Sequence, residues 1–304
     1  LQEQLLWRDW SATLGLRSEF IVYRRTNALA QNGMGGSGQT HLWAVIPALG
    51  VTYSLLPSLV LFAGVHSGFA PPRVEDVIDD TGGITELQPE RSWNWEFGLR
   101  GTPVPGIRLE LTAFRLDFQN QIIPATLAGG VIATLTNAGR TLHQGLEGVL
   151  EVDAERLSGL DGLSLLWAVT WLPVARYEGE RFSILNPQVR ITGHRLPYAP
   201  EYLHSLTVQW KPWDGVMLQA VVTSVGAQFA DDLNTVAPTP NGRQGRIPPF
   251  TVVDGTAEWH IGRSGLRLAL AVKNALNRLY IADRSRGILP GAPRTVSLEL
   301  GWER

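Results

Sequence analysis

A strict two-residue alternation that recurs along the chain is the strongest constraint on its fold. In the stretch RSWNWEFGLRG, residues 91–101, Trp93, Trp95 and Phe97 share one parity, while Asn94 and Glu96 share the other. Successive side chains of a β-strand point to opposite faces, so the pattern predicts a strand with one apolar and one polar face. A soluble sheet buries its apolar face, whereas a membrane barrel turns that face toward lipid and keeps the polar face in a wet lumen.

Twelve segments have strand character, and almost nothing in the chain is predicted to be helical. They span residues 10–22, 42–53, 58–66, 91–101, 107–122, 141–153, 163–173, 202–211, 216–229, 251–261, 266–273 and 294–302. Most are close to or slightly above the roughly 9–11 residues with which a tilted strand crosses a bilayer. Two segments are irregular. The apolar parity switches around Thr112-Ala113-Phe114, which we interpret as a β-bulge, and residues 216–229 have almost no polar face.

The connections between these segments alternate in length. Short connections rich in turn formers lie at residues 54–57, 102–106, 212–215 and 262–265, with a somewhat longer one at 154–162. Long connections lie at residues 25–41, 68–90, 123–140, 174–201, 230–250 and 274–293. Soluble domains seldom carry so many long irregular loops, whereas membrane barrels have short periplasmic turns and long outer loops.

Tryptophan tests this topology, because its amphipathic ring favours membrane interfaces and the chain has 11 of them. If the short turns are periplasmic, Trp43, Trp93 and Trp95 belong to an outer belt, and the inner belt holds Trp210, Trp213, Trp259 and Trp302. The sequence therefore predicts an all-β fold, an antiparallel transmembrane β-barrel of which about 12 strands are present.

Composition and motifs argue against several classes of function. A net charge of −2 provides no basic surface for nucleic acid, so no nucleic-acid partner is expected. The absence of cysteine excludes disulfides and cysteine-ligated zinc, and the six histidines have no paired spacing, so no metal site is predicted. The acidic residues among positions 75–80 lack the spacing of a calcium loop and are interpreted as a solvated loop. No catalytic or nucleotide-binding signature occurs, so neither an enzyme nor a cofactor is expected.

Several motifs in the correct order resemble TonB-dependent outer-membrane receptors. The first is the strand Leu87-x-Pro89-Glu90-x-Ser92-x-Asn94-x-Glu96-x-Gly98-x-Arg100. The others are Asn137-Ala138-Gly139 with Gly145-Leu146-Glu147, the loop from Ala230-Asp231-Asp232 and Asn234 to Gly245-Arg246-Ile247-Pro248, Val272-Lys273-Asn274-Ala275-Leu276-Asn277 with Tyr280, and Gly291-Ala292-Pro293-Arg294. Within the family, Gly68-Phe69-Ala70-Pro71-Pro72-Arg73 is most similar to receptors of the ferric dicitrate type.

The resemblance implies an outer-membrane receptor for energised uptake of a ferric siderophore, built as a 22-stranded barrel around an N-terminal plug. Twelve strands occupy 304 residues, so 22 strands would need on the order of 550. Residues 1–304 are therefore expected to be the C-terminal half of the barrel, with the plug and first strands absent. The expected partners are a ferric siderophore, outer-membrane lipid, and a TonB-type energising protein that acts through the absent N-terminal region. The alternative is a complete 12-stranded barrel such as an autotransporter translocator or an outer-membrane phospholipase.

Arginines of the long connections are the candidate ligand-binding residues. A citrate-like ferric siderophore is anionic, and the planar guanidinium group meets a carboxylate with two hydrogen bonds. The last long loop carries Arg284 and Arg286, and Arg284 is favoured because in the resembling receptors this loop folds over the ligand. The other candidates are Arg181 in the fourth long connection and Arg73 after the double proline. A solvated role is the competing interpretation for each of them.

Overall fold

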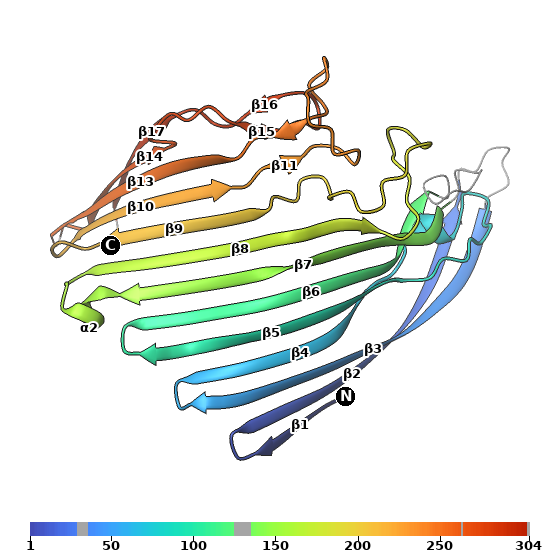
Figure 1. The fold of residues 1–304 in the computed structure, drawn as a ribbon, viewed down its shortest axis with the longest axis horizontal. Coiled ribbons are helices and arrows are strands. Elements are labelled where there is room, and N and C mark those ends of the chain that lie inside the picture. Colours follow the sequence, from blue (N-terminus) through green and yellow to red (C-terminus); the bar gives the residue numbers. More distant parts are fainter. Residues whose placement is uncertain (29–35, 125–134, 263, 303–304) are drawn as a thin grey trace.

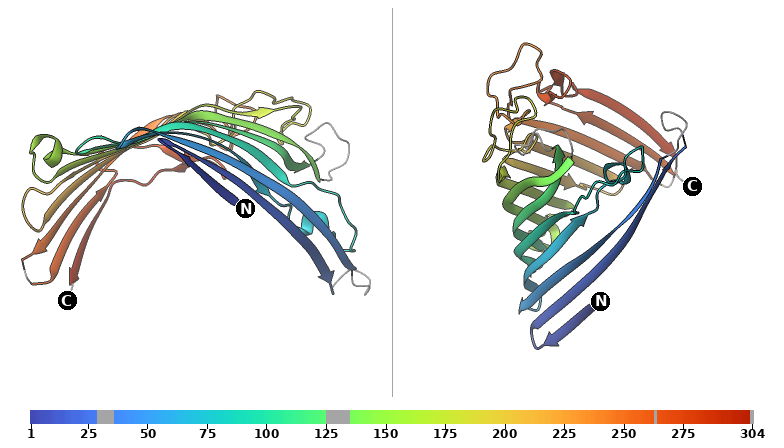
Figure 2. Two further views of the ribbon diagram at one scale, coloured as in Figure 1. Left: turned by 90° about the horizontal axis from the view of Figure 1, so that it is seen from below. Right: turned by 90° about the vertical axis from the view of Figure 1, so that its right-hand side faces the viewer.

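Thirteen strands form one continuous antiparallel sheet in the computed structural model, which describes residues 1–28, 36–124, 135–262 and 264–302. The sheet contains β1 (Gln2–Trp7), β2 (Trp10–Asn27), β3 (Gly36–Leu56), β4 (Leu59–Ala70), β5 (Glu90–Val104), β6 (Ile107–Pro124), β7 (Leu135–Asp153), β8 (Leu163–Glu178), β9 (Tyr202–Trp210), β10 (Val216–Val225), β13 (Phe250–Ile261), β14 (Leu266–Lys273) and β17 (Thr295–Trp302). Each strand pairs with its neighbours in this order, and β1 and β17 have one neighbour each, so the topology is an up-and-down meander (Figure 1). The meander curves into an open trough (Figure 2).

The remaining elements are short and lie in the connections. Two small hairpins pair β11 (Gln228–Phe229) with β12 (Arg246–Ile247) and β15 (Ile281–Asp283) with β16 (Leu289–Pro290). Helix α1 (Val74–Val77) follows β4, and α2 (Ala154–Ser158) joins β7 to β8. No helix within the described ranges is long and apolar enough to cross a membrane.

The pairing register gives the sheet two chemically different faces. Directly paired residues share a face, so Ala63, Phe97, Ala113 and Leu146 form one row across β4 to β7, which Trp171 of β8 continues. Large apolar side chains of this face are unusually exposed for a folded chain, as in Phe97 at 60% and the β17 residues. Exposed apolar surface on this scale marks a membrane-facing wall.

The opposite face is polar and concave. Across β13, β14 and β17, Arg267 lies between Glu258 and Glu299 and forms an ion pair with each of them. The connection that carries α1 folds into the concave side of the trough (Figure 2), where Val77 and Ile78 pack against Tyr23 and Leu42. The alternation of the sequence therefore separates a lipid-facing wall from a polar lumen, as predicted.

The strands continue farther toward the long connections than the alternation indicates. All twelve predicted segments are strands, but β3 has 21 residues, and β6 and β7 extend into the predicted connection at 123–140. At about 3.3 Å per residue and a tilt near 45°, a strand of this length rises on the order of 50 Å, about twice the apolar band of an outer-membrane barrel. Trp43, Trp93 and Trp95 accordingly lie several residues inside their strands, whereas Trp210 and Trp302 end theirs.

Three predictions about strands need correction. Strand β1 was missed, because its six residues give only a brief and weak alternation. The predicted strand at 216–229 ends at Val225, and Gln228–Phe229 forms a separate hairpin. The predicted bulge at Thr112-Ala113-Phe114 is wrong, because the pairing of β6 with β5 and with β7 runs through these residues without a shift. The parity switch marks instead the level at which the outer face of β6 becomes charged.

The described strands do not form a closed barrel. In a meander of thirteen strands the first and last run in the same direction, so β1 and β17 cannot form the antiparallel pair that closes a bacterial barrel. Both are edges of the sheet, and their residues are mostly exposed. A complete 12-stranded barrel is therefore not the structure that these residues form.

Candidate ligand-binding site

Three connections gather at the end of the trough opposite the short turns, namely residues 179–201, 226–249 and 274–294 (Figure 1). These connections contain three of the predicted ligand-binding arginines. Their backbone is irregular, so its polar groups depend on side chains for hydrogen bonds. The side chains that supply these bonds fix the shape that the loops present to the lumen.

Buried carboxylates join the first two of these loops. Asp232 is 6% exposed and accepts hydrogen bonds from the Ser183 hydroxyl at 2.8 Å and from the Ile184 amide at 2.8 Å. Asp231, equally buried, accepts from the amide and hydroxyl of Thr235 and from the Gly245 amide. A carboxylate is buried only when several donors compensate its desolvation, so both aspartates are structural anchors of residues 226–249.

Arg195 fastens the loop 179–201 to the outer half of β8. Its guanidinium group donates to the carbonyl oxygens of Ala199 at 2.7 Å, Leu172 at 2.6 Å, Pro200 at 3.1 Å and Pro173 at 3.2 Å. The Arg195 backbone also forms two reciprocal hydrogen bonds with the side-chain amide of Asn234, at 2.7 and 2.8 Å. One arginine therefore links its own loop, β8 and the loop 226–249.

The third loop is attached through Arg284, which is only 4% exposed. Its Nη1 donates to the Gly242 carbonyl at 2.9 Å, and its backbone amide donates to the Tyr198 hydroxyl at 3.3 Å. The Arg284 Nε is buried without a hydrogen-bond partner among the described residues. Arg284 thus bonds the hairpin of β15 and β16 to both neighbouring loops, and its Nε–H group stays available as a hydrogen-bond donor.

The other predicted arginines lie in different surroundings. Arg286 is exposed on the connection between β15 and β16, and Arg73 is exposed immediately before α1. Arg181 is half-buried, with its guanidinium carbon 5.5 Å from the centre of the Tyr177 ring and with its Nε unpartnered within the described part of the chain. Burial lowers the pKa of the Arg181 guanidinium group. The structure thus places Arg284 and Arg286 on one hairpin, and ligand binding by all four arginines stays a prediction.

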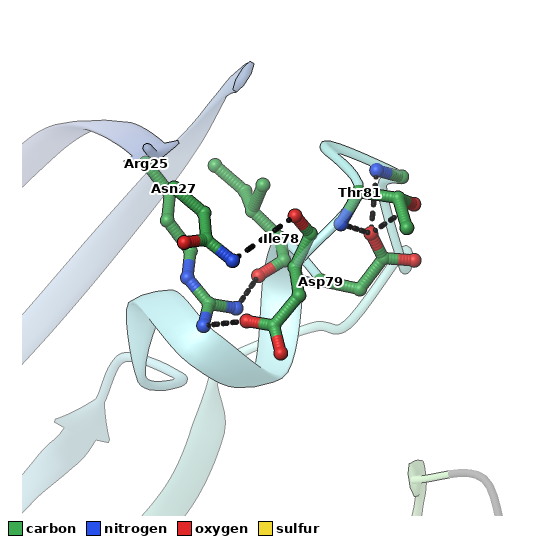
Figure 3. A network of polar contacts seen from close by, with 7 residues as sticks. Arg25, Asn27, Ile78, Asp79 and Thr81 are labelled. Carbon is green, nitrogen blue, oxygen red and sulfur yellow. Dashed lines mark hydrogen bonds and ion pairs between the residues drawn. The ribbon is translucent and has the colours of Figure 1, made fainter. Parts of the chain in front are cut away.

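The connection that carries α1 is held inside the trough by the end of β2 (Figure 3). Arg25 donates to the Ile78 carbonyl and forms an ion pair with Asp80. The Asp79 carboxylate accepts from the hydroxyl of Thr81 at 2.7 Å and from its amide at 2.8 Å, and these bonds hold the pKa of Asp79 below its ordinary value. Asp79 and Asp80 of the acidic stretch therefore shape and anchor this loop.

Asparagines from the family motifs fasten other loops to strand ends. Asn274, at a φ of 47°, donates to the carbonyls of Arg278 and Ala292, both at 2.9 Å. Asn137 bonds the backbone of Gln88 in both directions at 2.7 Å and donates to the Asn120 carbonyl. Asparagine is a usual sequence signal for a left-handed position such as that of Asn274, but the Gln88 partner of Asn137 lies 49 residues away and has no local signature.

Comparisons with known proteins agree with this architecture. Residues 1–275 match the family model of the TonB dependent receptor-like β-barrel. The chain is 27% identical over 220 residues to the ferrienterobactin receptor of Escherichia coli (strain K12), a match that covers 69% of this chain and 27% of the relative. It is 26% identical over 228 residues to the ferrioxamine receptor of Yersinia enterocolitica, covering 71% and 28%.

A solved structure of a transporter has a similar fold. The ferric citrate transporter FecA in its unliganded form superposes with a TM-score of 0.76 and 26% identity, covering 96% of this chain and 42% of that one. The chain thus spans roughly a third or less of the length of the two curated relatives and less than half of the solved chain.

Proposed function

Because the chain belongs to the TonB-dependent receptor-like β-barrel family, we propose that it is part of an outer-membrane receptor for the energised uptake of a ferric siderophore. Members of this family are outer-membrane β-barrels of Gram-negative bacteria that work as receptors and transporters, not as enzymes. The observation that carries the proposal is the apolar convex face and polar concave face that persist across thirteen strands beneath cross-linked loops.

The proposal assigns residues 1–304 to the C-terminal half of a larger barrel. The remaining strands, an occluding plug and the region that a TonB-type energising protein grips would lie outside these residues. The physical support is that β1 and β17 each leave one side of their backbone unpaired, which hydrocarbon cannot satisfy. Neighbouring strands on both sides would remove that cost.

For the ligand, we propose a ferric complex of the citrate type. The matched proteins are named for ferrienterobactin, ferrioxamine and ferric citrate, so family membership alone does not choose among them. Two features favour citrate. Residues 68–73 resemble the ferric dicitrate type, and exposed arginines, Arg73 and Arg286, lie on two of the long connections. Guanidinium groups suit a ligand whose surface consists of carboxylates.

Uptake by the full-length receptor tests both levels of the proposal. The receptor would be produced in a strain that lacks its own siderophore receptors, and import of radiolabelled iron would be measured as ferric citrate, ferrioxamine or ferric enterobactin. We expect import of ferric citrate that stops when TonB is deleted. Import of another ferric siderophore, but not ferric citrate, would refute only the ligand. No TonB-dependent import of any of the three would refute the receptor function.

Substitution separates ligand contacts from loop anchors. In the full-length receptor, Arg286→Ala and Arg73→Ala should each weaken ferric citrate binding by roughly tenfold or more, because a hydrogen bond to a charged group contributes about 1.5–3 kcal/mol. Tryptophan fluorescence gives the dissociation constant. Arg108→Ala is the matched control, because Arg108 forms an exposed ion pair with Glu151 near the short-turn end. Equal affinity of all three variants would remove both arginines from the binding site.

A further inference from the structure

The convex wall of β6 to β8 changes from apolar to charged at one level. On β6 the outward residues Leu111 and Ala113 are followed by Arg115 and Asp117. Arg115 is paired with Trp95 of β5, and Asp117 is paired with Trp93. Tryptophan marks the membrane interface, so these charges lie at the headgroup level on the side of the long connections. They face away from the lumen and cannot serve the cargo.

Two more arginines complete a charged recess at this level. Arg176 of β8 and Arg140 of β7 share the outward face, and together with Arg115, Asp117 and Glu178 they line a cavity of about 350 Å³ above Leu142. Arg115 forms a two-bond pair with Asp117 at 2.8 and 2.9 Å, and Arg176 pairs with Glu178 at 2.7 Å. The Arg140 guanidinium makes no hydrogen bond or ion pair within the part of the chain that the structure describes. Three arginines against two carboxylates give the recess a net charge of +1.

An apolar groove of about 730 Å³ adjoins the charged recess on the same wall. The small side chains of Ala63 and Ala113 leave space beside the Phe97 ring, and Trp95 and Trp171 form walls of the groove. Arg115 lines both the groove and the recess, so the two are contiguous. An apolar groove that ends at unpaired positive charge at the interface matches a molecule with an acyl chain and an anionic headgroup.

We propose that this surface binds an outer-leaflet lipid whose headgroup carries phosphate, with an acyl chain in the groove and the phosphate beside Arg115, Arg140 and Arg176. The charge of the recess complements phosphate, and the groove continues the lipid-facing wall. Asp117 and Glu178 moderate the site, because a phosphate competes with them for Arg115 and Arg176. The inference rests on the outer-membrane location of the proposed function, with the long connections on the outer side, and it is independent of which cargo the receptor carries.

The test uses the purified, delipidated full-length receptor and native mass spectrometry. The probes are hexa-acylated bisphosphorylated lipid A, the same lipid without its phosphates, and inorganic phosphate. We expect the bisphosphorylated lipid to bind the wild type. Replacing Arg115, Arg140 and Arg176 by alanine should weaken it by about fivefold per arginine, on the order of 100-fold together. Glu178→Gln should strengthen binding severalfold, because it frees Arg176. Equal binding of the dephosphorylated lipid or of inorganic phosphate alone would overturn the proposal.

Two further variants and a folding assay separate loss of the lipid site from misfolding and from general effects of removing an arginine. Ala113→Phe should fill part of the groove and weaken binding of the acylated lipid without changing the charge of the recess. Arg108→Ala is the control on the same strand, because Arg108 has the opposite parity and faces the lumen. Heat-dependent electrophoretic mobility verifies that each variant is a folded barrel. If folded variants with three arginines removed bind the lipid as tightly as the Arg108→Ala control, the site is refuted.

Discussion

Replacing Arg195 is expected to release the loop 179–201 without unfolding the barrel. Its guanidinium group donates to four carbonyl oxygens, two within β8 and two immediately before β9. A hydrogen bond from a charged group contributes about 1.5–3 kcal/mol, but four bonds that share one group are not additive, and water can replace some of them at this partly exposed site. We therefore expect Arg195→Ala to lower the free energy of local opening by about 3 kcal/mol.

Hydrogen exchange of the full-length receptor in detergent measures this opening. A loss of about 3 kcal/mol corresponds to exchange on the order of 100-fold faster for the amides of Leu172 and Leu196, which donate to Glu201 and Ala175 respectively. Arg190→Ala is the control, because Arg190 belongs to the same loop and is exposed, with one side-chain bond to Thr192. Unchanged exchange in the Arg195 variant, or faster exchange spread evenly over all strands, would contradict this role of Arg195.

Three further predictions concern the wall and the last loop. Leu111→Arg should destabilise folding into lipid vesicles by about 2–4 kcal/mol in a urea titration, whereas Thr112→Arg, which faces the lumen, should cost less than about 1. Gly291→Ala drives a Cβ atom into the Tyr280 ring, so it should displace that ring, cost about 1–3 kcal/mol and speed proteolysis of residues 274–294. Hydrogen bonds from Ser285 lower the pKa of Asp283 to about 2. Because the unfolded value is about 3.9, the hairpin of β15 and β16 should be stabilised above about pH 4 and should become sensitive to pepsin as the pH falls toward 2, and Asp283→Asn should abolish this dependence.

The sequence predicts the strands well wherever lipid lies on one side and water on the other, because only that situation produces a period of two. The boundaries near the short turns are close, as at Val104 and Ile107. The opposite strand ends were predicted too short, since both faces are wet there and residues such as those at 36–40 carry no apolar alternation. The switch of apolar parity at Ala113 is visible in the sequence, but the β-bulge that it suggests is not present. In a single strand, a change from a lipid-facing to a water-facing outer surface produces the same pattern as a shift in register.

The site was less predictable than the sheet. Arginine is the residue type that the sequence offers for an anionic cargo, but nothing near Arg284 in the sequence reveals that its guanidinium group bonds a carbonyl 42 residues away. The same is true of Arg195, which has no sequence signal at all, and of Asp232, whose only sequence signal is its place in a family motif. The motif side chains bond the backbone of one segment to the backbone of another. This structural role identifies the family but contains no information about the ligand.

The bonds made by Asn137, Asn234 and Asn274 have a consequence for how such proteins diversify. Their partners are main-chain atoms, which every amino acid possesses. Substitutions in the loop tips between these attachment points therefore need not disturb the backbone positions that the asparagines hold. A receptor of this kind can change its ligand specificity while its loops stay attached to the strands.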